Sequence, residues 1–265
     1  MTGAEPTTWI FLRGLAREAG HWGGFVEQFA RAFPNDEMLP IDLPGTGEFR
    51  DQMSPRSIQE IFTFVRAAAV QRARSQGQFK LVAVSLGGMV AAYVALPHVQ
   101  ARPEDLSGCV LINSSARSLS PAIQRLRWQV WPKLLKIVAN QVVREREKSV
   151  IDILINDPDA RERALPLWIK LGNEHPVSYL TFASQLWAAS RFKGLGAPTK
   201  VPVLLLAGMG DRFVDPSCSM ALASTWNWPL VKHPWGGHDL TWDDPDWVLV
   251  RIREWVNRRS TSATL

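Results

Sequence analysis

Short apolar runs recur along the chain, and longer helical patterns separate them. The runs are at Trp9–Leu12, Met38–Ile41, Phe79–Val84, Cys109–Ile112, Val201–Ala207 and, more weakly, Leu230–Lys232. Near-continuous apolar strands separated by helices are typical of a parallel sheet buried on both faces. The pattern therefore predicts an α/β fold, with a mostly parallel central sheet covered by helices on both faces.

The helical patterns between these runs fit the same architecture. They are at Gly24–Ala32, Pro55–Arg74, Leu86–Leu96, Pro216–Thr225 and Asp246–Asn257. Pro55 and Pro216 are expected in the first helical turn, where proline is tolerated. With 265 residues, the chain is long enough for one large α/β domain and does not require two.

One segment, from Arg117 to Gly196, breaks the alternation. It is helical in pattern and rich in Trp, Leu and Arg, and it is too long to be a connecting loop. We therefore expect an inserted helical lid over residues 117–196 and a core formed by residues 1–116 and 197–265. Within the lid, the alternating charges of Arg144–Lys148 are typical of a solvated helix face.

The sharpest local motif surrounds Ser85. The sequence Lys80-Leu-Val-Ala-Val-Ser85-Leu-Gly-Gly-Met89 takes an apolar strand directly into a helix, with small residues two before and two after the serine. This turn is so tight that those flanking positions must be small, and it lifts the hydroxyl above the sheet edge at a helix N-terminus. Ser85 is the candidate nucleophile, and a serine cap of an ordinary helix is the alternative.

A serine hydroxyl is a poor nucleophile without a base beside it. Among the five histidines, His238 follows two glycines in the loop after the last expected strand. Because glycines let such a loop approach the sheet edge closely, His238 is the candidate base and His233 the second choice. His21 lies in an early loop that could line a pocket, and no role is assigned to His98 and His175.

The imidazole in turn needs a carboxylate that fixes its tautomer and stabilises the imidazolium. Asp211 follows the run Val201–Ala207, at the carboxyl end of a strand, where open α/β sheets place their sites. Asp215 precedes Pro216 and is better explained as a helix N-cap. Helix capping also explains most of the aspartates in the final loop, which are Asp239, Asp243, Asp244 and Asp246.

Four further segments carry a family resemblance. Trp9–Leu15 is similar to a first strand and the turn after it, and Asp42–Gly47 is similar to an Asp-x-Pro-Gly-x-Gly turn. Leu206–Asp211 is similar to a loop that carries the acid, and Gly236–His238 is similar to a loop that carries the base. Together with the chain order Ser85, Asp211, His238, these motifs resemble the α/β-hydrolase superfamily, specifically its small, lidded, esterase-like members. The resemblance covers nearly the whole chain outside the expected lid.

The resemblance also implies an oxyanion hole. It places the two donors on the backbone N–H groups of Leu15 and Leu86. Two residues depart from the family pattern, because Arg13 stands where a histidine usually precedes Gly14 and Ala83 stands where the serine turn usually has its first glycine. Backbone donors do not depend on the Arg13 side chain, so we expect the oxyanion hole to be retained.

Composition excludes several other classes of function. The net charge of +5 comes from Lys and Arg interleaved with Asp and Glu, and no basic run or recognition motif indicates a nucleic-acid partner. No apolar segment reaches the ~18 residues of a membrane span, and the N-terminus lacks a secretory signal pattern. Two cysteines do not form a disulfide framework, so a cytoplasmic location is expected. Cys109 lies in an apolar run and is expected to be buried.

The sequence thus predicts a serine hydrolase that cleaves a small-molecule carboxylic ester through an acyl-enzyme intermediate. It uses no cofactor, and no histidine pairing indicates a metal site. A carbon–carbon bond hydrolase, a thioesterase or a lactonase would use the same residues, and a non-catalytic binding protein on this fold is the competing class. The sequence leaves open the oligomeric state, the acyl and alcohol specificity, and whether basic lid residues contact an anionic substrate: Arg125, Arg127 and Lys133.

Overall fold

The computed structural model describes residues 6–74, 78–95, 106–194 and 201–262. Within them, six strands form one sheet in the order β2-β1-β3-β4-β5-β6, and every paired register is parallel. The strands are β1 (Thr8–Leu12), β2 (Glu37–Ile41), β3 (Phe79–Val84), β4 (Leu106–Ile112), β5 (Val203–Gly208) and β6 (Leu230–His233). The α/β fold with a parallel sheet, predicted from the apolar runs, is confirmed.

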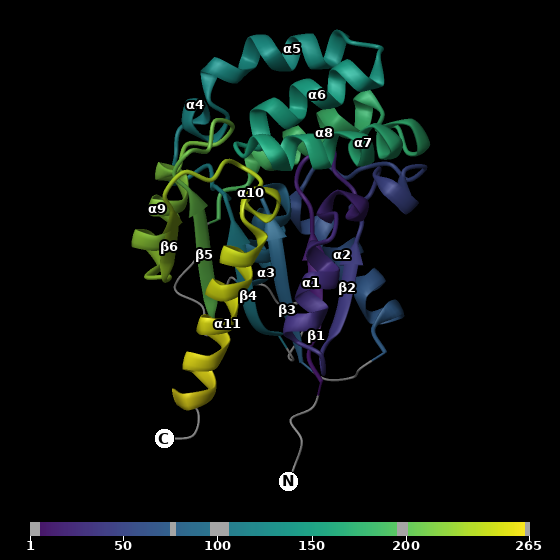
Figure 1. Ribbon diagram of the computed structural model, residues 1–265. Coiled ribbons are helices and arrows are strands. Elements are labelled where there is room, and N and C mark those ends of the chain that lie inside the picture. The colour runs from purple at the N-terminus through teal and green to yellow at the C-terminus, as the bar shows by residue number, and fades with distance from the viewer. Residues whose placement is uncertain (1–5, 75–77, 96–105, 195–200, 263–265) are drawn as a thin grey trace.

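Helices cover both faces of this sheet (Figure 1). They are α1 (Phe25–Ala32), α2 (Ile58–Arg72), α3 (Leu86–Ala95), α9 (Ser217–Trp226) and α11 (Pro245–Ser262). Along β1, Ile10 and Leu12 join an apolar cluster with α2, α3 and α9, whereas Trp9 and Phe11 join a second cluster with α1 and α11. Successive strand side chains point to opposite faces, so a continuous apolar run supplies both clusters.

Between β4 and β5 the chain forms a helical segment above the carboxyl ends of the strands (Figure 1). Its helices are α4 (Ala122–Arg125), η3 (Trp128–Val130), α5 (Trp131–Ala139), α6 (Val143–Leu154), α7 (Pro158–Glu174) and α8 (Tyr179–Arg191). We call residues 117–194 the cap segment. Its helices have an apolar cluster of their own around the fully buried Trp168. The role of this segment as a lid stays a prediction.

Short helical elements complete the loops around the carboxyl end of the sheet. They are η1 (Ala19–Trp22), η2 (Gly47–Phe49) and α10 (Leu240–Asp243). The expected start of α2 at Pro55 is wrong, because the helix begins after Ser57. The Ser57 hydroxyl accepts the Glu60 N–H at 3.2 Å and donates to the Glu60 carboxylate at 2.6 Å, which caps the helix N-terminus there.

Other expected helix boundaries also differ from the structure. Helix α9 begins at Ser217, with Pro216 as its N-cap, and α11 continues beyond the expected end at Asn257. The expected helix end at Leu96 and the residue His98 lie outside the described residues.

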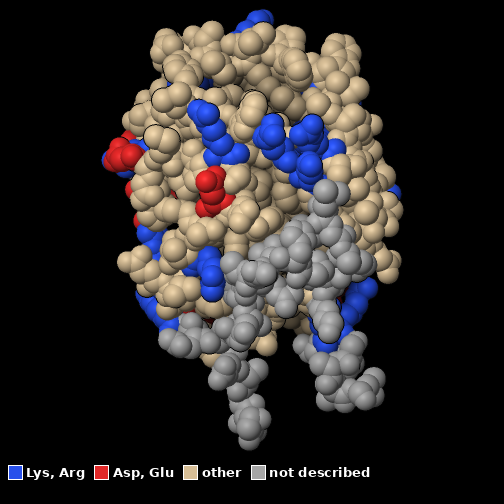
Figure 2. Space-filling view, turned by 180° about the vertical axis from the view of Figure 1, so that it is seen from behind, with Lys and Arg blue, Asp and Glu red and all other residues tan. Residues whose placement is uncertain are grey.

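The surface carries its basic side chains in a dispersed pattern. On the face shown in Figure 2, Lys and Arg form separate groups between uncharged surfaces, with no continuous stripe in view. No helix in the described ranges combines the length and the apolar character needed to cross a membrane. The prediction that the chain has no nucleic-acid partner stays a prediction.

Candidate active site

Ser85 connects β3 to α3 in a strained turn. Its backbone φ is +56°, a left-handed conformation that costs a non-glycine residue of the order of 1–3 kcal/mol. Its N–H donates to the carbonyl of Ile112 at 2.9 Å, so the neighbouring strand holds the turn. The hydroxyl group is therefore presented at the carboxyl end of the sheet, directly before the first turn of a helix.

The small residues of the motif are explained by close packing. A Cβ atom at Gly87 would lie 2.6 Å from the carbonyl oxygen of Leu12 and 2.7 Å from that of Arg13. A Cβ atom at Gly88 would lie 2.8 Å from the Cβ of Ser114. Ala83 is fully buried and fits the position where the resemblance expects glycine.

Asp211 and His238 are in direct contact. The Asp211 Oδ2 atom lies 2.7 Å from His238 Nδ1, and its Oδ1 accepts backbone N–H groups of Phe213 and Val214 at 2.8 and 2.9 Å. These contacts fix the carboxylate against the imidazole. The other ring nitrogen of His238, Nε2, has no hydrogen-bond partner in the described part of the chain, so it is available to a group in the cavity that His238 shares with Ser85.

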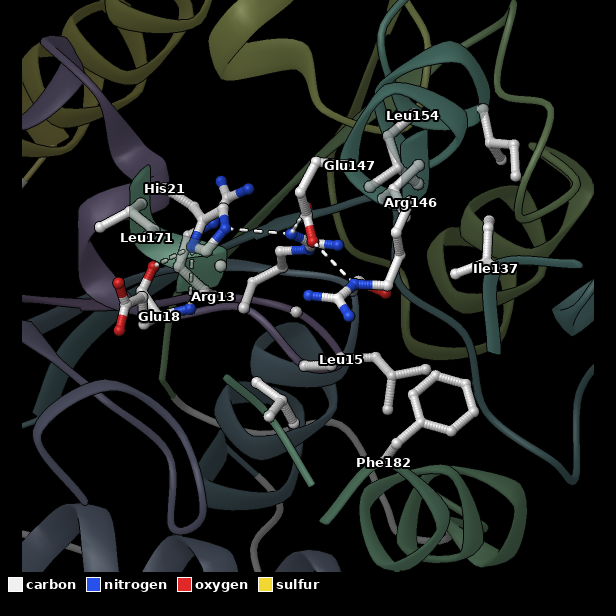
Figure 3. A pocket seen from close by; sticks show the side chains of 18 of the residues that line it. Arg13, Leu15, Glu18, His21, Ile137, Arg146, Glu147, Leu154, Leu171 and Phe182 are labelled. Atoms are coloured by element: carbon white, nitrogen blue, oxygen red, sulfur yellow. Dashed lines mark hydrogen bonds and ion pairs between the residues drawn. The ribbon is translucent and has the colours of Figure 1, made fainter. Parts of the chain in front are cut away.

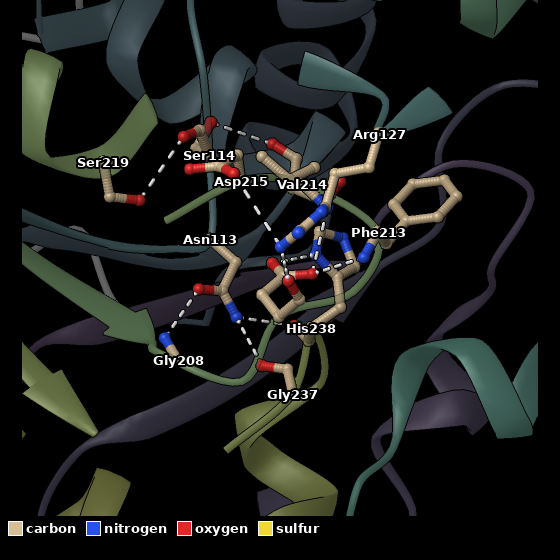
Figure 4. A network of polar contacts seen from close by, with 12 residues as sticks. Asn113, Ser114, Arg127, Gly208, Phe213, Val214, Asp215, Ser219, Gly237 and His238 are labelled. Atoms are coloured by element: carbon tan, nitrogen blue, oxygen red, sulfur yellow. Dashed lines mark hydrogen bonds and ion pairs between the residues drawn. The ribbon is translucent and has the colours of Figure 1, made fainter. Parts of the chain in front are cut away.

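Asn113 ties the end of β5 to the loop that carries His238 (Figure 4). Its Nδ2 donates to the carbonyls of Gly237 at 2.9 Å and His238 at 2.8 Å, and its Oδ1 accepts the Gly208 N–H at 2.9 Å. Asn113 was not among the residues predicted from the sequence. The available signal was a polar side chain directly after the buried run Cys109–Ile112.

His233, the second choice for the base, supports the loop instead. Its Nδ1 accepts the Gly236 N–H at 2.8 Å, and its Nε2 lies 3.2 Å from Asp244. The ring packs edge-on against Trp235 and Trp247. Both nitrogens are therefore engaged outside the cavity that contains Ser85.

Two aspartates of the final loop have roles other than helix capping. The Asp243 carboxylate accepts the backbone N–H groups of Asn156 and Asp157 at 2.7 and 2.8 Å, which attaches the loop after His238 to the cap segment. Burial raises the pKa of Asp243 despite these hydrogen bonds. Asp239 forms an ion pair with Arg13. Capping thus explains Asp244, which accepts the Trp247 N–H at 3.0 Å, but neither of these two.

The ion pair of Arg13 and Asp239 is buried, with side-chain exposures of 3% and 1%. Arg13 Nη1 donates to Asp239 Oδ1 at 3.3 Å, the guanidinium lies over the Trp22 ring, and Thr241 donates to the same carboxylate at 2.7 Å. Arg13, which departs from the family pattern, therefore joins the loop after β1 to the loop that carries His238.

The two residues expected to supply the oxyanion donors both lie near Ser85. Leu86 is the first residue of α3, where backbone N–H groups have no intrahelical acceptor. Leu15 follows Gly14, at which a Cβ atom would lie 3.1 Å from the Cβ of Ser85. The next residue, Ala16, donates its N–H to Gln185 of α8 at 2.8 Å. Leu15, Ser85 and Leu86 line one small cavity.

Ser85 and His238 open onto a larger cavity of about 400 Å³ between the sheet and the cap segment (Figure 3). One part of its wall is apolar and includes Leu15, Leu134, Ile137, Val150, Leu154, Phe182 and Phe213. The other part carries charged or titratable groups, which are Arg13, Arg17, Glu18, His21, Arg146, Glu147, His175 and Asp239. The cavity can therefore accept a ligand with both an apolar and a polar part.

The expected solvated helix face at Arg144–Lys148 is wrong for Glu147. This side chain is buried, and its Oε2 accepts from Arg17 Nη1 at 2.6 Å. Burial lowers the pKa of the adjacent His21, and the nearby Arg17 and Arg13 cations lower it further. His21 lines the cavity, as the sequence indicated it could, and it is held in its neutral form.

None of the three basic residues considered for an anionic substrate lines the large cavity. Arg125 donates to the Ser115 hydroxyl and to a backbone carbonyl of α8. Arg127 Nη1 donates to the Asp211 carbonyl at 3.0 Å. Lys133 is exposed on α5. No cluster of three or more His, Cys, Asp or Glu side chains suited to a metal ion occurs in the described ranges.

Comparisons with known proteins agree with this fold. The profile of the alpha/beta hydrolase family matches residues 9–251, and no curated protein matches the sequence. Among solved structures, a thermophilic esterase from Thermogutta terrifontis is 19% identical, with a TM-score of 0.71 over 96% of this chain and 91% of that one. An enol-lactonase from Burkholderia xenovorans is 17% identical, with a TM-score of 0.72 over 97% and 94%.

A third solved structure belongs to a protein that is named for a different activity. It is a putative non-heme bromoperoxidase from Mycobacterium tuberculosis, 18% identical, with a TM-score of 0.73 over 97% of this chain and 94% of that one. At such identities the likeness concerns the fold, and the same fold carries several activities. The reaction therefore has to be argued from the site itself.

Proposed function

Because the chain belongs to the alpha/beta hydrolase family, we propose that it is a serine hydrolase that cleaves carboxylic esters of small molecules. Ser85 is the nucleophile, His238 the base, and Asp211 the carboxylate that orients the base. The observation that carries the proposal is the 2.7 Å contact of Asp211 with His238 Nδ1. This contact leaves His238 Nε2 available in the cavity that contains Ser85.

In the proposed mechanism, His238 takes the hydroxyl proton of Ser85 while the serine oxygen attacks the ester carbonyl. The tetrahedral oxyanion accepts hydrogen bonds from the backbone N–H groups of Leu15 and Leu86. His238 then protonates the leaving alcohol, and an acyl-enzyme remains. Water, deprotonated by His238, then attacks the acyl carbonyl. The bond from the acyl carbon to the Ser85 oxygen breaks, His238 returns the proton to that oxygen, and the carboxylic acid is released. In well-studied hydrolases, removal of one oxyanion donor raises the barrier by roughly 3–4 kcal/mol.

Three supports of the site favour this assignment over a simple binding role. The Ser85 backbone is held in a strained conformation, and such strain persists where the surrounding structure enforces it, often at active sites. Phe213 packs against the His238 ring at 4.9 Å between centroids. Asn113 fixes the loop of His238. Together these contacts hold the nucleophile and the base in place, which a catalytic site requires.

The test uses Ser85→Ala with a short p-nitrophenyl ester. The variant is expected to lose hydrolysis while its thermal unfolding stays unchanged, and a fluorophosphonate probe is expected to label Ser85 of the wild type. Ser120→Ala is the matched control, because Ser120 is buried but does not line the cavity. Full turnover by Ser85→Ala, or an adduct mapped to Ser114 or Ser115, would remove the assignment.

Assays of the same purified protein distinguish the substrate classes that this arrangement of residues could cleave. A panel of matched esters, thioesters and lactones is expected to show the highest kcat/KM for an ester. A higher value for a thioester or a lactone would keep Ser85 as nucleophile and replace the ester assignment. Binding of all three classes with no turnover would favour a binding protein.

A further inference from the structure

Two arginines share one carboxylate in the charged part of the cavity. Arg17 Nη1 donates to Glu147 Oε2 at 2.6 Å, and Arg146 Nε donates to Glu147 Oε1 at 3.3 Å. Glu147 is only 4% exposed, and the group lies in the cavity that holds Ser85. Two guanidinium cations therefore contact a single carboxylate in this group.

The other two carboxylates of the wall contact other partners. Glu18 lies 2.8 Å from His175 Nδ1, and Asp239 is paired with Arg13. Neither of them contacts Arg146 among the described residues. A partly buried cation is costly unless a counterion accompanies it, and Arg146 shares its carboxylate with Arg17, so an anionic ligand would be favoured beside Arg146.

The two arginines differ in their freedom to bind a ligand. Arg17 is held by three contacts, because its Nη1 also lies 3.0 Å from His21 Nε2 and its guanidinium lies over the Trp168 ring. In Arg146 only Nε is engaged. Its two terminal nitrogens have no protein partner among the residues described, and Figure 3 shows the guanidinium extending into the cavity on the side of Leu15.

The part of the wall close to Arg146 is apolar. Figure 3 shows Ile137 and Phe182 beside the space that Arg146 and Leu15 border, and all four residues line the same cavity. An ester seated with its carbonyl at the Leu15 N–H would extend its chain past these apolar side chains. Arg146 would then meet a group at the distal end of that chain.

We propose that the substrates are esters that carry a carboxylate at the end remote from the ester bond, and that the terminal nitrogens of Arg146 bind this carboxylate. Monoesters of aliphatic dicarboxylic acids are the simplest members of this class. The planar fork of arginine donates two parallel hydrogen bonds to a carboxylate, and the apolar wall accepts the methylene chain between the two groups. This inference rests on the proposed ester hydrolysis.

The test compares monomethyl esters of succinic, glutaric, adipic and suberic acid with matched esters in which a primary amide replaces the free carboxylate. Hydrolysis is followed by acid release in a pH-stat. For the best chain length, we expect wild-type kcat/KM to be at least tenfold higher for the carboxylate than for the amide. Arg146→Gln is expected to reduce this ratio about tenfold, mainly through the KM of the carboxylate substrate.

The matched control is Arg144→Gln on the same helix, since Arg144 is exposed and does not line the cavity. It should leave the ratio unchanged. A second readout is binding to Ser85→Ala by titration calorimetry, where the carboxylate ester should bind at least tenfold more tightly than its amide, and Arg146→Gln in that background should remove the difference.

The possible failures are distinguishable. Turnover of amide and carboxylate esters at equal kcat/KM, or a preference that Arg146→Gln does not alter, would overturn this inference and leave the ester hydrolase intact. Absence of turnover with every ester, together with no fluorophosphonate labelling of Ser85, would overturn the proposed function itself.

Discussion

The core and the cap segment differ in how tightly their side chains are held and in how many apolar side chains they expose. In the core, the groups that face the cavity are held by strand ends and buried hydrogen bonds, as for Ser85 and His238. In the cap segment, large apolar side chains are often exposed, and nine of the fourteen such side chains in the described residues lie there. Trp128, Trp131 and Leu135 are more than half exposed.

This difference assigns the proposed chemistry to the core and the proposed selection of substrates to the cap segment. The proposed nucleophile, base and acid come from the loops that follow β3, β6 and β5, on a sheet buried on both faces. The cap segment contributes the wall that contains Arg146 and Glu147, and the apolar side chains of α5 and α8. In the proposed function, the core supplies the reaction and the cap segment selects the ester.

The largest expected effect tests whether the chemistry lies in the core alone. Asp211→Asn should lower kcat for a p-nitrophenyl ester by about 10⁴-fold, because an amide does not stabilise the required tautomer of His238. Its thermal unfolding should remain that of a folded protein. Asp215→Asn is the control, since Asp215 lies four residues on and points to Arg127, and comparable losses in both variants would contradict the assignment.

The second effect compares one leucine from each region. Leu111→Ala, in the fully buried centre of β4, should lower the free energy of unfolding by about 2–5 kcal/mol because it leaves a cavity. Leu135→Ala, at a position that is 73% exposed on α5, should change it by less than about 0.5 kcal/mol. Urea unfolding measures both, and a large effect of Leu135→Ala would mean that the cap surface is packed in solution.

The third comparison uses one glycine from each region. Gly87→Ala should lower the free energy of unfolding by about 1–3 kcal/mol, because its Cβ would meet two backbone oxygens that cannot move independently. Gly172→Ala in α7 would meet a methyl group of the Val143 side chain at 2.9 Å, and not fixed backbone atoms. Its unfolding free energy should stay within about 1 kcal/mol of the wild type, since alanine also favours the helix. Equal losses would show that the cap segment is as rigid as the core.

The smallest expected effect is at the junction of the two regions, where His21 of the core lies edge-on to Trp168 of the cap segment. Because the folded state lowers the pKa of His21 below its usual 6.5, the unfolded chain binds the proton more readily. Its contribution to stability is present above about pH 6.5 and is lost as the pH falls, by at most about 1.4 kcal/mol per pH unit.

His21→Gln should therefore weaken the acid-induced loss of stability between about pH 6.5 and 5, as measured by urea unfolding at several pH values. Burial raises the pKa of Glu18 and Asp42, and those groups act in the opposite direction in both proteins. The difference between the two proteins isolates His21, and identical pH profiles would contradict a neutral buried imidazole.

Much of the core could be predicted from sequence because buried parallel strands are continuous apolar runs. All six runs became strands, most within two residues of the expected ends. The start of β4 was missed by three residues because Ser107 and Gly108 interrupt its apolar pattern. Gly108 is needed there, since a Cβ atom would lie 2.6 Å from Trp255, and nothing local to the sequence reveals that ring.

The candidate site was less predictable where it depends on partners distant in the chain. The positions of Ser85, Asp211 and His238 could be proposed because each follows a strand. The charged group of Arg17 and Glu147 joins residues 130 positions apart, and local charge alternation indicated solvent exposure for Glu147. Pairing across such separations depends on the fold and leaves no trace in the local pattern.

The buried pair of Arg13 and Asp239 has a consequence for how the enzyme is made. Its partners are 226 residues apart, so the guanidinium of Arg13, directly after β1, is neutralised only after the final loop has been synthesised. A chain still emerging from the ribosome would carry the serine turn without the base loop. The nascent polypeptide should therefore lack the proposed hydrolase activity. A single proteolytic cut that releases the loop after β6 should abolish that activity in the finished protein.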